Sequence, residues 1–199
     1  MRKITLILIA IVLLSSTISA QKSKVGITLT PFAWNSLVRF TPYNIDDDYT
    51  AKNSFSLGAV YITPLFKKYD LETGFEFGHY YIDIAGKSSI KSVSLLNFPL
   101  GIRYNWRKNI FLNTGLLADI DLSNKSPMDV DGNDNDAVYQ NGIGAYIGAG
   151  YTFDLKNGFS MFVNPYLKAH KIVYPFDKEW NSLRIFDYGI KVGVTYDLK

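Results

Sequence analysis

The sequence predicts an all-β protein, an eight-stranded antiparallel up-and-down transmembrane β-barrel. Apolar and polar residues alternate with a period of two in eight segments, which is the pattern of β-strands. Short turns and longer polar links alternate between these segments, as they do in barrels of this kind. The apolar faces also carry more bulky side chains than the interior of so small a barrel can hold.

The first twenty residues have the pattern of a secretory signal peptide. Arg2 and Lys3 give a positively charged start, the apolar run 4–14 follows, and small and polar residues lead to a cleavage site. A transmembrane anchor is disfavoured because this run is shorter than the roughly 18–20 residues of a spanning helix. We therefore expect residues 1–20 to be a signal peptide and residues 21–199 to form one outer-membrane barrel domain.

The charge and composition of the chain exclude several classes of protein. The formal net charge of +3 includes Arg2 and Lys3, so the rest of the chain carries about +1 and has no basic cluster for nucleic acid. The chain contains no cysteine, which excludes disulfides, thiol catalysis and most zinc sites. Aromatic residues make up 15% of the sequence, a content that favours strands.

Each predicted strand is a segment with one apolar and one polar face. In chain order, the segments are 24–34, 53–65, 69–83, 91–106, 109–122, 139–153, 158–170 and 184–198. In the last of them, Ile190, Val192 and Val194 share one face. Gly189 and Lys191 lie on the other face, as the period of two requires.

The sixth segment is rich in glycine at alternate positions. Its glycines at 142, 144, 148 and 150 do not give the G-x-G-x-x-G spacing of a dinucleotide-binding loop, and no helical pattern follows. Ile143, Ile147 and Tyr151 alternate with these glycines. We predict a strand whose nearly bare face lines the lumen and leaves room for bulky inward side chains. The expected occupants of this room are Arg103, Phe162, Tyr166 and Lys168.

The connections between the segments alternate in length. Short turns are expected at 66–68, 107–108 and 154–157, and longer links at 35–52, 84–90, 123–138 and 171–183. An even number of strands with short turns at one end and long loops at the other is typical of outer-membrane barrels. A soluble up-and-down barrel has similar connections.

The volume of the side chains decides which face points inward. The apolar faces carry roughly five or six large residues per strand, which would not fit inside an eight-stranded barrel. We therefore predict that the apolar face points outward to lipid and that the polar face lines the lumen. Trp106 and Tyr151 lie beside short turns, and Trp34 and Tyr81 lie near long links. This placement fits two belts of aromatic residues at the membrane interfaces.

The fourth to sixth segments also resemble a known family. The run from Leu96 to Tyr104 resembles the L-x-x-P-L-x-x-x-Y strand of the PorT-like outer-membrane β-barrel family, which is common in Bacteroidota. Gly115 and the G-x-G-Y run at 148–151 resemble later motifs of that family. The resemblance covers roughly residues 21–199. It implies an eight-stranded barrel in the bacterial outer membrane, in a family most of whose members have no assigned function and a few of which take part in protein secretion.

Charged residues of both signs fall on the predicted inward face. Because unpaired charges in a narrow lumen are costly, we predict a hydrogen-bonded ion-pair network that plugs the barrel. We expect Arg103 at its centre, since its planar fork is able to bridge two carboxylates. A narrow gated pore is the alternative. The predicted members are Arg103, Glu72, Glu76, Asp119, Asp121, Lys168, Asp187 and Lys191, and Lys24 and Asp197 share their parity.

An acidic stretch at 129–136 resembles a calcium-binding loop. Its weak candidate ligands are Asp129, Asp131 and Asn133. The EF-hand register fails, because position 6 is Asp134 rather than Gly and position 12 is Gln140 rather than Glu. We therefore expect a plain surface loop, and no metal or other cofactor.

The sequence gives little support for catalysis. His79 falls on the lipid-facing parity and His170 on the inward parity, and either would need a serine such as Ser92 or Ser94 as nucleophile. No G-x-S-x-G nucleophile motif is present. We therefore expect a non-enzymatic protein.

These observations predict a monomeric outer-membrane barrel with a plugged polar lumen that acts through its extracellular loops. Adhesion, envelope integrity and a scaffold role in an outer-membrane assembly remain open. The expected partners are outer-membrane lipid, lipopolysaccharide and an envelope protein, but no nucleic acid. The alternatives are a narrow pore, a lipid-modifying outer-membrane enzyme and a soluble periplasmic ligand-binding barrel.

Overall fold

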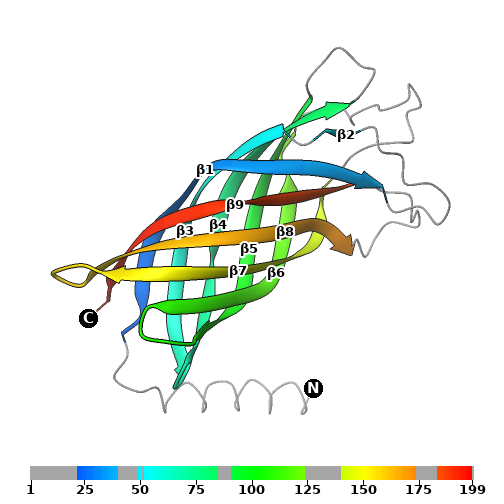
Figure 1. The fold of residues 1–199 in the computed structure, drawn as a ribbon. Coiled ribbons are helices and arrows are strands. Elements are labelled where there is room, and N and C mark those ends of the chain that lie inside the picture. Colours follow the sequence, from blue (N-terminus) through cyan, green and yellow to red (C-terminus); the bar gives the residue numbers. More distant parts are fainter. Residues whose placement is uncertain are drawn as a thin grey trace, which may run out of the picture.

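The chain folds into a closed barrel of antiparallel strands (Figure 1). The computed structural model describes residues 22–39, 49–50, 52–84, 91–123, 140–173 and 183–198. The strands are β1 (Lys24–Arg39), β2 (Tyr49–Thr50), β3 (Lys52–Phe66), β4 (Tyr69–Ile84), β5 (Lys91–Asn105), β6 (Ile110–Asp121), β7 (Gly142–Asp154), β8 (Phe159–Val173) and β9 (Leu183–Asp197). No helix in the described part of the chain is long and apolar enough to cross a membrane.

The barrel has an up-and-down topology. Each of the eight long strands pairs with its neighbours in the sequence, and β1 pairs with β9 to close the sheet. The short β2 adds two residues beside the end of β4. The eight long strands match the eight predicted segments, which confirms the predicted fold class, whereas β2 was not predicted.

The first strand is longer than its sequence pattern indicated. Thr30 and Ala33 both face inward and are nearly fully buried, because the pairing register of β1 shifts between them. The two intervening residues, Pro31 and Phe32, form a bulge on the outer face. The alternation therefore changes parity and continues through Asn35, and the strand itself extends to Arg39. The predicted link at 35–52 begins too early for this reason.

A second bulge lengthens β8. Its register against β7 shifts between Ile143 and Ala145, and His170 and Lys171 are both buried in the lumen. Lys171 has a φ of 50°, a left-handed conformation that non-glycine residues adopt rarely. This bulge ends the simple period of two, which is why the predicted strand stopped short of Val173.

The apolar faces of the strands point outward, as predicted. Ile27, Leu57 and Ile147 are 66%, 56% and 59% exposed, whereas the neighbouring inward residues Thr28 and Ser56 are buried. The aromatic residues of the two expected belts also lie outside the barrel. Trp34, Tyr81, Trp106 and Tyr151 are all exposed.

The lumen also contains an apolar cluster that the polar pattern did not predict. Val60, Ile62, Phe111 and Phe162 are buried inside the barrel and form one group. The rings of Phe111 and Phe162 meet edge to face, with their centres 6.1 Å apart. This cluster fills the lumen toward the end with the short turns.

The bare inner face of β7 accommodates side chains from neighbouring strands. A Cβ atom at Gly148 would lie 2.6 Å from the Oδ1 atoms of Asn113 and Asn164. At Gly150 it would lie 2.2 Å from the Phe111 ring. The room predicted beside these glycines is therefore present. The nearest side chains at these two glycines are Asn113, Asn164 and Phe111. Of the predicted occupants, Tyr166 lies opposite Gly148 in the register, and Arg103, Phe162 and Lys168 are also buried in the lumen.

Candidate functional site in the lumen

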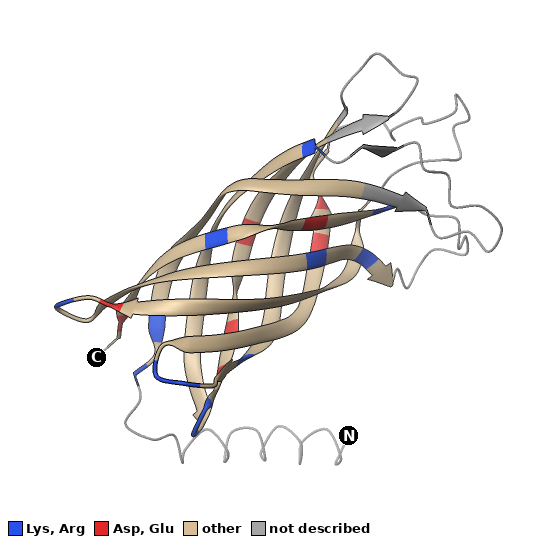
Figure 2. Ribbon diagram, viewed as in Figure 1, with Lys and Arg blue, Asp and Glu red and all other residues tan. Residues whose placement is uncertain are grey.

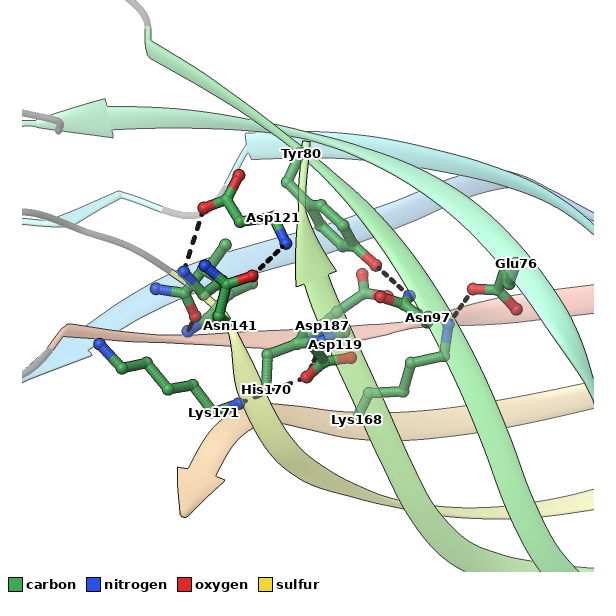
Figure 3. A network of polar contacts seen from close by, with 12 residues as sticks. Glu76, Tyr80, Asn97, Asp119, Asp121, Asn141, Lys168, His170, Lys171 and Asp187 are labelled. Carbon is green, nitrogen blue, oxygen red and sulfur yellow. Dashed lines mark hydrogen bonds and ion pairs between the residues drawn. The ribbon is translucent and has the colours of Figure 1, made fainter. Parts of the chain in front are cut away.

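Four charged side chains from three strands meet in the middle of the lumen. Glu76 of β4 accepts a hydrogen bond from Lys168 of β8 (Figure 3). It also forms an ion pair with Lys191 of β9, whose Nζ atom lies 2.6 Å from Glu76 Oε2. Lys168 also lies 3.9 Å from Asp187 Oδ2. We call Glu76, Lys168, Asp187 and Lys191 the seal.

Neutral side chains complete the hydrogen bonding of Asp187. Ser54 donates a hydrogen bond of 2.9 Å to Asp187 Oδ1, and the Tyr166 hydroxyl donates one of 2.8 Å to Oδ2. Lys168 and Lys191 also lie near the face of the Tyr166 ring, with their Nζ atoms 4.6 and 5.6 Å from its centre. Because every charge in the seal has a partner of opposite sign, its burial is compensated.

Arg103 lies outside the seal, so the prediction that it forms the centre of the network was wrong. Its Nε donates a hydrogen bond of 2.9 Å to Glu72, which also accepts a 3.2 Å bond from Asn113. The Arg103 guanidinium stacks on Phe111, with Cζ 3.8 Å from the ring centre, and lies 5.1 Å from that of Phe162. Among the described residues it therefore pairs with one carboxylate and rests on the apolar cluster.

Asp119 belongs to a second group nearer the long-loop end of the barrel. Its Oδ2 atom lies 3.1 Å from His170 Nδ1 and accepts a weaker bond from the backbone N–H of Lys171. The His170 ring meets Tyr80 edge to face, with their centres 5.3 Å apart. Asp119 thus pairs with His170, which the sequence placed on the inward parity but to which it assigned no partner.

Asp121 holds the end of β6. It accepts hydrogen bonds from the backbone N–H groups of Ser123 (2.8 Å) and Gln140 (3.0 Å). Its own N–H donates to Asn141, as Figure 3 shows. In the described part of the chain it makes no ion pair, so its predicted place in the network was wrong.

Sequence reasoning from charges alone missed the neutral members of the lumen. Tyr80, Asn97 and Ser54 are buried there and hydrogen-bond to one another or to charged groups, and Tyr166, which was expected in the lumen, bonds to Asp187. Tyr80 has the same parity in its strand as Glu72 and Glu76, which was the available signal. Charged residues on the inward parity predict partners because an unpaired charge is costly to bury. A neutral residue on the same parity predicts no particular contact.

The packed side chains leave almost no free volume at mid-lumen. The void that Glu72, Glu76, Lys168 and Lys191 line, with other residues, is about 10 Å³. A void of this size holds about one water molecule. The space between the side chains at this level of the barrel is therefore smaller than a hydrated ion.

The structure also brings together a serine and a histidine on the outside of the barrel. His79 Nδ1 lies 2.8 Å from Ser94 Oγ across the β4–β5 pair, between the rings of Phe55 and Tyr81. Of the described residues, no carboxylate contacts His79 to complete a triad. Ser92 lies two residues before Ser94 on the same strand and is exposed.

The predicted metal ligands lie outside the described residues. This applies to Asp129, Asp131 and Asn133. Within the described ranges, no three His, Asp or Glu side chains are grouped to hold a metal ion.

The comparisons with known proteins bear on the fold. No protein-family model and no curated protein sequence matches the chain. Among solved structures, the outer membrane protein OprG from Pseudomonas aeruginosa is similar at 13% identity and a TM-score of 0.50, over 89% of this chain and 97% of that one. The outer membrane protein AlkL in lipid bilayers is similar at 11% identity and a TM-score of 0.52, over 92% of this chain and 94% of that one. The chain therefore has the fold of a small eight-stranded outer-membrane β-barrel.

Proposed function

We propose that this chain is an outer-membrane protein with a sealed lumen, which acts without catalysis through its extracellular loops. The observation that carries the proposal is the seal, in which Glu76 pairs with Lys168 and Lys191 across the middle of the barrel. If the barrel is blocked at mid-height, transport through the lumen is not its role. The longer connecting segments are then the parts that contact other molecules. These contacts would serve adhesion, envelope integrity or a scaffold role.

The outer surface of the barrel supports insertion into the outer membrane. Apolar side chains such as Ile27, Leu57, Leu116 and Ile147 are more than half exposed around its circumference. In water, so large an apolar surface would drive aggregation, whereas lipid stabilises it. The partners of this surface are membrane lipids and, at the outer leaflet, lipopolysaccharide.

The sealed lumen is tested by conductance in planar lipid bilayers. The unmodified protein should give no steady channels. Replacing Glu76, Lys168 and Lys191 together by alanine should open a path and give channels. The substitution removes three long side chains from the narrowest part of the lumen. The matched control is Lys24→Ala with Asp197→Ala, which removes a pair outside the seal. Steady channels from the unmodified protein would show a pore instead.

The role of the loops is tested by complementation in a strain that lacks the gene. One variant replaces segments 40–48, 124–139 and 174–182 by short turns and keeps the barrel. It should reach the outer membrane but should not restore adhesion or resistance to detergent. Full restoration by this variant would mean that the barrel wall itself carries the function.

A further inference from the structure

The end of the barrel with the short turns encloses a cavity that the seal does not use. This cavity, which we call the vestibule, has a volume of about 780 Å³ and lies between the barrel mouth and the apolar cluster. Its floor includes Ile62, Arg103 and Phe162, and its rim includes the turns at 67–68 and 106–108. The volume lies in the range of small-molecule binding sites, about 300–1,000 Å³.

The vestibule carries an excess of positive charge. Seven Lys and Arg side chains and three Asp side chains line it. Figure 2 shows cationic residues gathered at this end of the barrel. Lys67, Lys68 and Lys108 make no ion pair with any residue that the structure describes.

Two of the three acidic side chains have partners among the described residues, although Asp70 Oδ1 itself accepts no hydrogen bond there. Asp197 lies 3.4 Å from Lys24, and Asp70 accepts a 2.8 Å hydrogen bond from Asn105. The remaining acid, Asp154, is exposed at the end of β7. The positive charge of the vestibule therefore exceeds the negative charge, so the rim attracts an anionic ligand. The concave shape concentrates this electric field.

Arg103 provides a specific contact at the floor. The residue is 5% exposed and its Nε atom is bonded to Glu72, but its Nη2 atom has no hydrogen-bond partner in the described part of the structure. A buried donor without a partner is costly, and an anionic oxygen is the acceptor that relieves this cost best. The guanidinium belongs to a residue that lines the vestibule, and it is held in place by Phe111 and Phe162.

We propose that the vestibule binds a small phosphate-bearing ligand with at least two negative charges. Arg103 would contact the phosphate at the floor, and the lysines of the two turns would neutralise the remaining charge at the rim. The apolar floor and Trp106 leave room for a moiety such as glycerol or a sugar. A phospholipid headgroup and a soluble phosphate compound share this chemistry. The site is independent of the seal and of the loops.

The direct test is a calorimetric titration of the protein in nonionic detergent with pyrophosphate. Saturable binding with one site per barrel is expected. A variant in which Lys67, Lys68, Arg107 and Lys108 are replaced by Gln should bind about ten-fold more weakly or worse, because it lacks the rim charges. Arg103→Gln should show a comparable loss. The heat-dependent gel shift of each variant checks that the barrel is folded.

Lys156→Gln is the matched control. Lys156 lies on the third short turn at the same end of the barrel, yet it does not line the vestibule. This variant should bind as the unmodified protein does. Absence of saturable binding would overturn the proposal, as would an equal loss in the Lys156→Gln variant, since general charge attraction would then explain the result.

The source of the phosphate is distinguished by two further ligands. Glycerol 3-phosphate and short-chain dihexanoyl phosphatidylglycerol are titrated under the same conditions. Tighter binding of the lipid points to a headgroup held by the vestibule and its apolar floor. Tighter binding of glycerol 3-phosphate points to a soluble ligand, and failure of both to compete with pyrophosphate would overturn the proposal.

Discussion

Glu76 joins two lysines in the middle of the lumen. It is the carboxylate shared by Lys168 and Lys191, and it lies on β4 while both lysines approach from the opposite side of the barrel on β8 and β9. Strands far apart in the sequence are thereby tied through the lumen. The free energy of each charge in this position depends on its partners, because water is largely excluded.

Replacing Glu76 by Gln should therefore destabilise the barrel strongly. Lys168 would remain buried with less compensation, and the expected loss in the free energy of unfolding is about 3–5 kcal/mol. Urea unfolding in lipid vesicles, followed by tryptophan fluorescence, measures it. Lys24→Gln is the control, because the Lys24–Asp197 pair is partly exposed, and it should cost about 0–1 kcal/mol. Equal losses in the two variants would contradict a special role for the seal.

The Ser94–His79 pair is expected to be structural. The bond satisfies two polar groups on the outer face of the barrel, where lipid offers no hydrogen-bond partner. A fluorophosphonate probe, which labels activated serines, should therefore not label the protein. Ser94→Ala should leave any measured hydrolysis of phospholipid in mixed micelles unchanged. Labelling that disappears in Ser94→Ala would instead identify a lipid-modifying enzyme.

At the scale of the strands, the sequence patterns carried most of the fold. Period-two alternation located all eight long strands, because a strand with one face in lipid and one in the lumen must alternate. The same patterns failed at the bulges near Pro31 and Lys171, where an extra residue changes the parity. The alternation of residues also could not predict which charged side chains pair with each other. Parity correctly placed Arg103 and Glu76 in the lumen. They lie at different depths and pair with different residues, because the depth of each side chain depends on the stagger between strands.

The close packing of the strands makes a prediction for Gly193 of β9. A Cβ atom at this position would lie 2.4 Å from two ring carbons of Phe162. Gly193→Ala should therefore destabilise the barrel by about 1–3 kcal/mol through overpacking. Adding Phe162→Leu should recover part of this loss, because the smaller side chain frees the space. Strict additivity of the two variants in a double-mutant cycle would contradict the contact.

The outward face of β7 makes a second prediction at this scale. Ile147 lies near the middle of the strand with its side chain outside, and Thr152 lies on the inner face near the mouth. Ile147→Arg should reduce stability in lipid by about 2–4 kcal/mol, because a charge at mid-bilayer is costly. Thr152→Arg should be milder, since its side chain reaches the vestibule. Folding yields into vesicles measure both, and the opposite order would reverse the assignment of inside and outside.

At the scale of the whole molecule, the two ends of the barrel differ in chemistry. The end with the short turns holds the basic vestibule, the middle holds the seal, and the other end carries the long connecting segments. In outer-membrane barrels the short turns face the periplasm and the longer loops face outward. This orientation would place the vestibule toward the periplasm, next to the inner leaflet.

The orientation can be tested directly because the chain contains no cysteine. A single cysteine introduced as Asn133→Cys lies in a long connecting segment, and one introduced as Lys156→Cys lies in a short turn. On intact cells, a membrane-impermeant maleimide should label the first variant and leave the second unlabelled. Opening the outer membrane should make the second variant reactive as well, which controls for the accessibility of its turn. Labelling of Lys156→Cys on intact cells would place the vestibule outside the cell. Its phosphate ligand would then have to come from the medium or from lipopolysaccharide, because the inner leaflet and the periplasm would lie at the other end of the barrel.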